Sequence, residues 1–290
     1  LPHFLSMSAT PIPRTLSLTI FGDLDLSIID ELPSGRKPII TKVVAATDRP
    51  KAHAFMRQEI KKGRQAFVIC AKIEATPMPE GVGAPTENPL PNPWDEVRAV
   101  MEEYEYLSKD IFPDFRVGVL HGKMKSVEKT KVMDDFAKNK TNILVAMSVI
   151  EVGVDVPNAT IMAIEDADRF GLAQLYQFRG RVGRSSHQSA CLLFTANKSA
   201  VSRERLKALT TAKNGFELAE KDLAMRGPGE FLGRTQTGMP DIAMNALNNM
   251  ELVKAAREAA AKVLKEDSNL KQNPLLEERL SIFRKAVHLE

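Results

Sequence analysis

Short apolar runs alternate with stretches of helical periodicity between residues 38 and 195. The apolar runs predict strands at residues 39–45, 66–71, 115–120, 142–147, 159–164 and 190–195. The intervening patterns predict helices at residues 51–62, 94–109, 126–139 and 172–179. Strands that alternate with helices are typical of a parallel sheet covered by helices on both faces. The pattern therefore predicts an α/β fold for this part of the chain.

The alternation stops after residue 195, and helical patterns dominate the rest of the chain. They cover residues 202–212, 216–225, 250–265 and 274–287, and a glycine-rich segment at 226–238 interrupts them. Asn214 and Gly215 form a good stop and restart between the first two helices. We expect a mostly helical C-terminal extension.

Three other segments divide the chain. Residues 1–10 have the pattern of a strand, and residues 33–38 have the composition of a linker. Residues 76–93 contain six prolines and two glycines, which indicates a surface loop. We therefore expect three parts, at residues 1–32, 33–197 and 198–290. Because the first residue is Leu1 and a strand is already running, we expect a piece of a longer protein.

Composition narrows the function only a little. Apolar residues make up 43% of the chain and charged residues 27%, as in an ordinary globular protein. The 40 basic and 37 acidic residues leave a net charge of +3, which permits a nucleic-acid partner without arguing for one. The two cysteines, Cys70 and Cys191, stand far apart in apolar runs, so we predict no disulfide framework, zinc ribbon or metal site. No apolar stretch is long enough for a membrane span.

The strongest local signal is a cluster of arginines and glycines between Gln177 and Arg184. Arg179, Arg181 and Arg184 stand within six residues, directly after an apolar helix face. A guanidinium group is always charged and matches phosphate oxygens in a bidentate way. The cluster is therefore a candidate for stabilising a transferring phosphoryl group. The alternative for such a cluster taken alone is a solvated basic turn.

Polar residues also follow three of the predicted strands. Gly153 and Asp155 come after the strand at 142–147, at the edge where open α/β sheets bind ligands. His121 and Gly122 end the strand at 115–120. A strand-end Asp is often only a cap, and a lone His is more often structural than catalytic.

Ser8 and Thr10 follow the predicted strand at the front of the chain. Their hydroxyl groups could sense a phosphate or relay a change between two lobes. The alternative is a proline-rich turn with a Ser or Thr cap.

In their order along the chain, these segments resemble the motifs of the superfamily 2 helicases. Residues 8–10 are similar to the Ser-Ala-Thr motif, residues 121–122 to the segment before motif V, residues 151–155 to motif V, and residues 177–184 to motif VI. The resemblance implies the RecA-like C-terminal lobe of a helicase, preceded by the end of a first motor lobe.

Later segments resemble the RecG type within this superfamily. The carriers are residues 171–177, 215–223, 226–233 and 234–238, the last three of which resemble a translocation motif. The resemblance implies an ATP-dependent translocase on double-stranded DNA that remodels forks, Holliday junctions and R-loops, works as a monomer away from any membrane, and resides in the bacterial cytoplasm at the nucleoid or in an organellar equivalent. One departure is Met147 where relatives usually have Thr, so Ser148 would have to supply a DNA contact.

The resemblance also implies roles for individual residues. Arg181 and Arg184 would act on the γ-phosphate, and Gly153, Asp155 and Gln177 would bind the nucleotide. The other roles are DNA binding by His121, Gly122 and Ser148, lobe coupling by Ser8 and Thr10, and translocation coupling by Arg205, Arg226 and Gln236.

The expected cofactors are ATP and Mg²⁺, bound mainly by a first motor lobe. The chain contains no G-x-x-x-x-G-K-[ST] pattern, so we expect it to be inactive by itself. Two alternatives stay open: the motor of a transcription-repair coupling translocase, and a non-catalytic binding module with a helicase-like lobe.

Overall fold

The computed structural model describes residues 35–71, 93–147, 155–226 and 250–286, together with residues 5, 7, 27 and 29. The chain forms two compact units. One is Glu31–Thr211, the sheet unit, and the other, the helical unit, combines Ala212–Glu290 with Leu1–Asp30. The predicted strand at residues 1–10 and, apart from Pro93, the predicted loop at 76–93 lie outside the described residues. The predicted boundaries at residues 32 and 197 stay a prediction.

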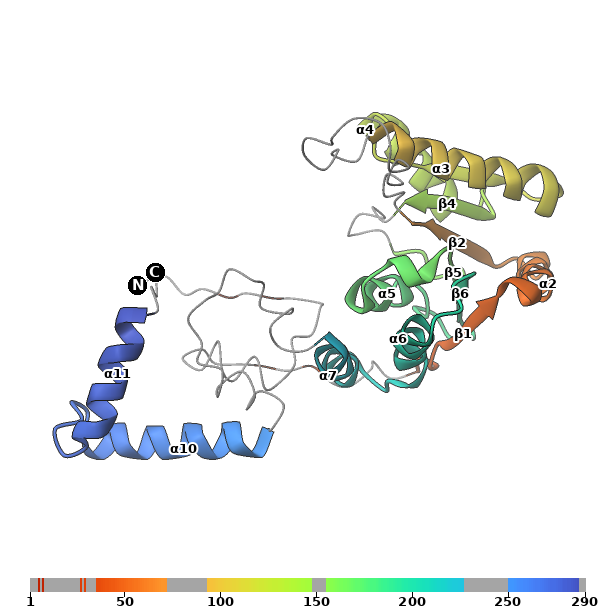
Figure 1. Cartoon of the computed structure of the whole chain (residues 1–290). Helices are drawn as coiled ribbons and strands as arrows, with labels where there is room; N and C mark the ends of the chain where they lie inside the picture. Colours follow the sequence, from red (N-terminus) through yellow and green to blue (C-terminus); the bar gives the residue numbers. More distant parts are fainter. Residues whose placement is uncertain are drawn as a thin grey trace, which may run out of the picture. The chain divides into compact units, whose positions relative to one another are not determined.

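The sheet unit contains a six-stranded sheet in the order β1-β6-β5-β2-β4-β3, and every pair is parallel (Figure 1). The strands are β1 (Ile40–Ala45), β2 (Gln65–Cys70), β3 (Val117–Leu120), β4 (Ile143–Met147), β5 (Ala159–Ile164) and β6 (Ala190–Thr195). Each lies within two residues of its predicted position. Residues of β2, β4 and β5 are buried throughout, because helices cover both faces of a parallel sheet.

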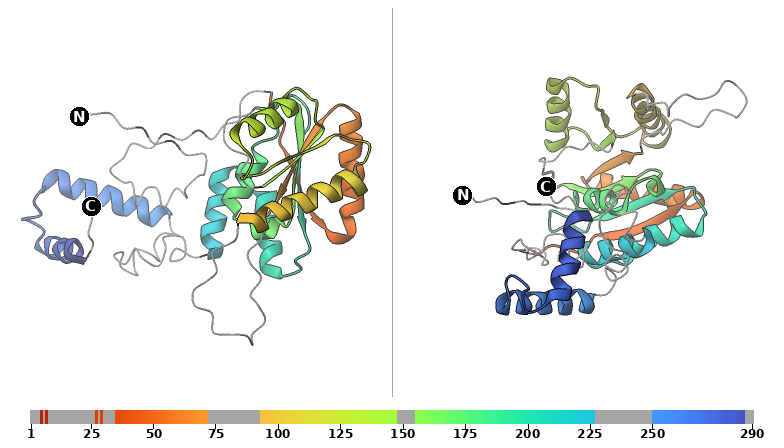
Figure 2. Two further views of the ribbon diagram at one scale, coloured as in Figure 1. Left: turned by 90° about the horizontal axis from the view of Figure 1, so that it is seen from above. Right: turned by 60° about the vertical axis from the view of Figure 1, so that its left-hand side comes forward.

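Helices lie on both faces of this sheet (Figure 2). They are α2 (Arg49–Lys61), α3 (Pro93–Tyr106), α4 (Ser126–Ala137), α5 (Leu172–Arg179) and α6 (Ala200–Thr211). One face packs Met56 of α2 and Val100 of α3 against alternate strand residues such as Val68. On the opposite face the rings of Phe67 in β2 and Phe136 in α4 lie 4.8 Å apart between centroids. These layers confirm the predicted α/β architecture.

Because all strands are parallel, their carboxyl ends lie along one edge of the sheet. His121 follows β3, Glu165 follows β5, and Thr195 ends β6. The segment after β4, residues 148–154, lies outside the described residues. This edge is where open α/β sheets bind ligands, so it is the first place to look for a site.

The helical unit contains α7 (Gly215–Arg226), α10 (Met250–Glu266) and α11 (Pro274–Ala286). Asn214 caps α7, because its Oδ1 accepts a hydrogen bond of 2.9 Å from the backbone N–H of Glu217. The predicted restart at Asn214 is therefore confirmed. Asp267 closes the turn between α10 and α11 by accepting hydrogen bonds from the backbone N–H groups of Lys271 and Gln272, at 2.9 and 2.6 Å.

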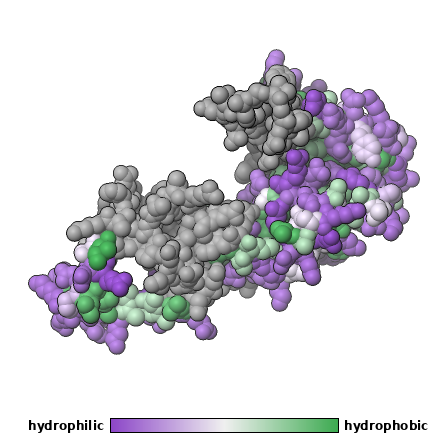
Figure 3. Space-filling model, viewed as in Figure 1, coloured by the Kyte–Doolittle hydropathy of each residue, from purple (hydrophilic) through white to green (hydrophobic). Residues whose placement is uncertain are grey.

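The surface of the described helices is mostly hydrophilic, with apolar side chains visible on α10 and α11 (Figure 3). The exposed apolar residues on those two helices are Leu252, Leu264, Leu275, Leu276 and Ile282. None of the described helices combines the length and the apolar character that crossing a bilayer requires.

Candidate active site at the arginine turn

The arginine cluster lies in a tight turn that ends helix α5. The backbone N–H of Gly180 donates to the carbonyl of Tyr176 at 3.0 Å, and that of Arg181 donates to the carbonyl of Phe178 at 3.0 Å. Val182 anchors the turn, because its side chain is 2% exposed. Gly183 has a φ of +77°, and a Cβ there would lie 2.8 Å from Cγ1 of Ile39. Any other residue would need a left-handed backbone and would press against Ile39, so the turn favours glycine at this position.

The three arginines of the cluster have different surroundings. Arg179 donates from Nη1 to the carbonyl of Leu209 at 3.0 Å, and its guanidinium lies 4.7 Å from the ring centre of Tyr176. Arg184 lies 3.4 Å from Asp155, between Nη1 and Oδ1. The guanidinium of Arg181 makes no hydrogen bond or ion pair with any described residue. The cluster therefore contains one arginine held by the fold, one shared with a carboxylate, and one without a partner in the described part of the chain.

Arg181 has the electrostatic character of an anion-binding group. Its side chain is half-buried, and both this burial and the positive charge of Arg184 lower its pKa. A guanidinium stays protonated despite such a shift, so the cost appears as unfavourable electrostatic energy. A phosphate beside Arg181 and Arg184 would relieve that energy by supplying the missing negative charge.

Asp155 connects the segment after β4 with the arginine turn. Its carboxylate is 59% exposed and reaches Arg184, and the next residue, Val156, is 3% exposed and anchored in the core. Gln177 lies exposed on α5, one turn before Arg181. The structure thus brings Asp155 and Arg184 together and sets Gln177 on the helix that leads to Arg181. Gly153 and Ser148 lie outside the described residues.

His121 and Gly122 form the loop between β3 and α4. The carbonyl of His121 accepts from the backbone N–H of Met124 at 3.2 Å, and its ring Nδ1 is buried without a hydrogen bond. Burial and the charge of Lys129 lower its pKa, and Glu128 opposes the shift. Gly122 is exposed, and a Cβ there would meet no atom within 4 Å. Packing in the described structure does not require glycine at this position.

The predicted coupling residues are only partly described. Arg205, on α6, donates from Nη2 to the carbonyl of Asp168, and its Nε is buried without a hydrogen bond. Arg226 is the last residue of α7. Gln236, Ser8 and Thr10 lie outside the described residues.

A second charged group, at the carboxyl edge of the sheet, was not predicted. Arg49, just after β1, forms an ion pair with Glu165, just after β5. Burial raises the pKa of Glu103, on α3, to about 7, and the negative charge of Glu165 adds to the shift. The signal in the sequence was the pair Glu165 and Asp166 directly after a buried strand, but nothing local indicates Arg49, which lies 116 residues earlier than Glu165.

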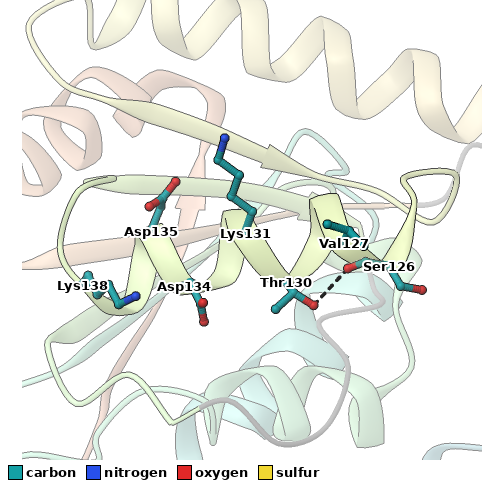
Figure 4. Close-up of a pocket in the computed structure, with 7 residues that line it drawn as sticks. All are labelled: Ser126, Val127, Thr130, Lys131, Asp134, Asp135 and Lys138. Carbon is teal, nitrogen blue, oxygen red and sulfur yellow. Dashed lines mark hydrogen bonds between the residues drawn. The ribbon is translucent and has the colours of Figure 1, made fainter.

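A hollow on the sheet unit lies away from these residues, along α4 (Figure 4). It is lined by Ser126, Val127, Thr130, Lys131, Asp134, Asp135 and Lys138. These residues belong to α4 except Lys138, which directly follows it, and none was a predicted site residue. Among the described residues there is also no group of three or more His, Cys, Asp or Glu side chains that could hold a metal ion.

Family models match two parts of the chain. Residues 92–186 match the helicase conserved C-terminal domain, and residues 212–288 match the C-terminal part of domain 3 of the ATP-dependent DNA helicase RecG. The first match contains His121, Asp155 and the arginine turn. The second contains α7, α10 and α11.

Similar proteins carry the RecG name. The ATP-dependent DNA helicase RecG of Synechocystis is 49% identical over 96% of this chain and 32% of its own length. That of Bacillus subtilis is 44% identical over 93% of this chain and 38% of its own length. A solved structure of RecG bound to a three-way DNA junction superposes with a TM-score of 0.63 and 39% identity, over 85% of this chain and 30% of that one.

The chain therefore spans about a third of the length of these relatives. The matches confirm the predicted fold, the RecA-like C-terminal lobe of a helicase, and they favour the RecG type over the two alternatives.

Proposed function

Because this chain belongs to the RecG family of ATP-dependent DNA helicases, we propose that it forms the arginine-bearing side of an ATP-hydrolysing site in a DNA translocase. The observation that carries the proposal is Arg181. Its half-buried guanidinium lies beside Arg184 in a tight turn and has no partner among the described residues. A positive group held in this way fits a phosphate whose negative charge grows during reaction.

Different residues of the site contact different parts of the nucleotide. Arg181 and Arg184 bind the γ-phosphate, Asp155 accepts a hydrogen bond from the ribose, and Gly153 and Gln177 are assigned further nucleotide contacts. When bound, ATP would supply the phosphoryl group that is transferred, and Mg²⁺ would supply positive charge that stabilises the phosphates. The other phosphate contacts and the Mg²⁺ ligands belong to a separate motor lobe, and Ser8 and Thr10 couple the two lobes.

Arg181 acts mainly on the transition state. The buried side chain of Val182 anchors the turn that bears it, so Arg181 stays close to its position as charge develops on the phosphate. Groups that are positioned in advance lower the barrier because they need not be reoriented during the reaction. Binding of ATP itself depends less on Arg181, because the interaction strengthens as the reaction proceeds.

The proposed substrate is branched double-stranded DNA, such as a fork, a Holliday junction or an R-loop. The similar RecG structure bound to a three-way DNA junction supports this choice. The open space above Gly122 suits the approach of a DNA backbone, and His121 and Ser148 contribute to the same contact. Arg205, Arg226 and Gln236 convert movement of the lobe into movement along the DNA.

The test uses the full-length protein that contains this chain. Its ATPase activity should rise on addition of a three-way junction, and it should unwind that junction. The chain of 290 residues alone should do neither, because its sequence contains no phosphate-binding loop pattern. Junction-stimulated hydrolysis by the isolated chain would contradict the division of the site between two lobes.

Coupling is tested with Arg226→Ala and Gln236→Ala in the full-length protein. Each variant should keep most of the junction-stimulated ATPase activity and lose unwinding, since neither residue belongs to the proposed nucleotide site. Melting temperatures of the same preparations provide the control. A parallel loss of ATPase activity, unwinding and thermal stability would instead mean that these residues only maintain the fold.

A further inference from the structure

Arg179 is the one arginine of the cluster that the proposed nucleotide chemistry does not use. Its Nη1 donates to the carbonyl of Leu209, 30 residues later, at 3.0 Å. Leu209 lies in the last turn of α6, which ends at Thr211. The last four carbonyls of a helix have no partner within the helix, and a cation at that end also interacts favourably with the helix dipole. Arg179 therefore donates a hydrogen bond to one of these carbonyls and places a positive charge at the C-terminal end of α6.

The guanidinium of Arg179 has a second contact. It lies 4.7 Å from the ring centre of Tyr176, at the distance of a cation–π interaction. Burial raises the pKa of the Cys191 thiol in β6 to about 12, and the charge of Arg179 opposes that shift. The contacts of Arg179 thus join α5 to α6.

The first half of α6 is attached to the same region by a second set of contacts. Arg205 donates to the carbonyl of Asp168, in the short helical turn that precedes α5. The carboxylate of Asp168 accepts from Thr195 at 2.5 Å and from Asn197 at 3.1 Å. Asn197 also donates to Oγ of Ser202, on α6, at 3.0 Å. Helix α6 is therefore fastened near both of its ends to residues that flank α5.

We propose that Arg179 is a positioning residue that ties α6 to α5, so that α6 moves together with the turn that carries Arg181 and Arg184. The inference rests on the proposed function, because it assigns α6 a part in transmitting the movement that accompanies ATP hydrolysis. Arg179 stands two residues before Arg181, at the point where α5 ends and the turn begins. A shift of that turn reaches α6 through the contact between Arg179 and Leu209.

The main variant is Arg179→Met in the full-length protein, since methionine keeps an aliphatic stem and removes the charge and the donors. The matched control is Arg203→Met on the same helix. Arg203 is exposed, and among the described residues its side chain donates only to the carbonyl of Lys198, two residues before α6. The number of base pairs opened per ATP should fall in Arg179→Met, because α6 loses the hydrogen bond that joins it to the end of α5. It should stay unchanged in Arg203→Met.

Arg179→Lys should recover part of the lost coupling, because a lysine keeps a cation at the end of α6. A fall in ATPase activity, unwinding and melting temperature together would show that Arg179 only stabilises the fold. Loss of hydrolysis with coupling intact would place Arg179 among the nucleotide-binding groups. Either result would overturn the proposal.

A distance measurement tests the positioning role independently of ATPase or helicase activity. Spin labels on Ala173→Cys of α5 and Lys207→Cys of α6, both at exposed positions, report the separation of the two helices. The background must lack other accessible thiols. The distance distribution should broaden in Arg179→Met and stay narrow in Arg203→Met. An unchanged distribution in Arg179→Met would contradict the proposal even in an active enzyme. A narrow wild-type distribution in a protein without helicase activity would instead count against the proposed function alone.

Discussion

Arg179 and Arg181 stand two residues apart, yet the guanidinium groups of the two residues have different surroundings. At the contact of α5 with α6, the guanidinium of Arg179 is occupied by a carbonyl and an aromatic ring. In the turn that follows, Arg181 has the charge of Arg184 nearby and no partner among the described residues. The difference shows that one arginine can serve as a structural contact while its neighbour is a candidate for ligand binding. The partners that each side chain has in the fold distinguish the two.

Among the substitutions that test this contrast, Arg181→Ala should have the largest effect. In the full-length protein, the ATPase turnover number should fall by about 10³–10⁵-fold, the range for loss of an arginine that stabilises a transferring phosphoryl group. Arg181→Lys should recover little, because an ammonium group cannot reproduce the bidentate geometry. Steady-state ATPase assays with saturating junction DNA measure the effect. Turnover near the wild-type value would favour the alternative interpretation, in which the cluster is only a solvated basic turn.

Gly183→Ala should have the next largest effect, through the backbone that presents Arg181. A left-handed alanine and a Cβ placed 2.8 Å from Cγ1 of Ile39 should together lower the free energy of unfolding by about 1–3 kcal/mol. Thermal or urea unfolding measures this loss.

Adding Ile39→Ala to Gly183→Ala separates the two causes. The double variant should relieve the clash but keep the backbone strain, so the two changes should be non-additive. Strictly additive losses would mean that Ile39 does not constrain the turn.

Two acidic residues at the carboxyl edge also differ in whether the carboxylate has a partner. Glu165 has Arg49 as its partner, whereas Oε1 of Glu103 is buried without a hydrogen bond. Burial raises the pKa of Glu103 from its ordinary value of 4.5 to about 7, so the folded state holds the proton more tightly than the unfolded state. Its contribution to stability is therefore present at about pH 4 and is lost as the pH rises toward 7.

Glu103→Gln should remove that part of the pH dependence. The variant should melt at a higher temperature than the wild type above pH 7, where the wild type carries a buried charge, and the difference should shrink near pH 5. Asp114→Asn is a control, because Asp114 is an exposed carboxylate paired with Arg57 and should show no such dependence. A difference that does not vary with pH would mean that Glu103 is not ionised in this range.

Asp155→Asn should have the smallest effect on stability. Its carboxylate is 59% exposed, and an exposed ion pair contributes about 0–1 kcal/mol to folding. The KM for ATP should nevertheless rise by about three- to tenfold, because the proposed ribose contact loses its charged acceptor. A large loss of stability with an unchanged KM would make Asp155 a structural partner of Arg184.

The sequence predicted the layers of the fold well because the physical signal is strong. The buried parallel strands appear as continuous apolar runs, and α5 has the predicted bounds, Leu172–Arg179. The predicted helix at residues 94–109 ends differently: α3 stops at Tyr106 and continues as a π-helical turn, Leu107–Ile111. Wider turns of this kind depend on packing, in this case of the buried Leu107 and Phe112, and have no periodic signature.

Within the site, the sequence indicated the arginine cluster but not the division of work inside it. Nothing in residues 177–184 shows that Arg179 faces a carbonyl of α6 while Arg181 does not, because Leu209 lies 30 residues away. The ion pair between Arg49 and Glu165 was hidden for the same reason. Partners that the tertiary fold brings together decide the role of each charge, and local sequence does not contain them.

The most direct test of the account is the affinity of the full-length protein for ADP with aluminium fluoride, which mimics the transferring phosphoryl group. We expect the wild type to bind this mimic in the presence of Mg²⁺ and junction DNA at least a hundredfold more tightly than ADP alone, as transition-state analogues do. Arg181→Ala should lose that preference while its affinity for a non-hydrolysable ATP analogue changes little, and Arg179→Met should keep the preference. An Arg181→Ala protein that retains the full preference for the mimic would contradict the central claim that this turn carries the catalytic arginine.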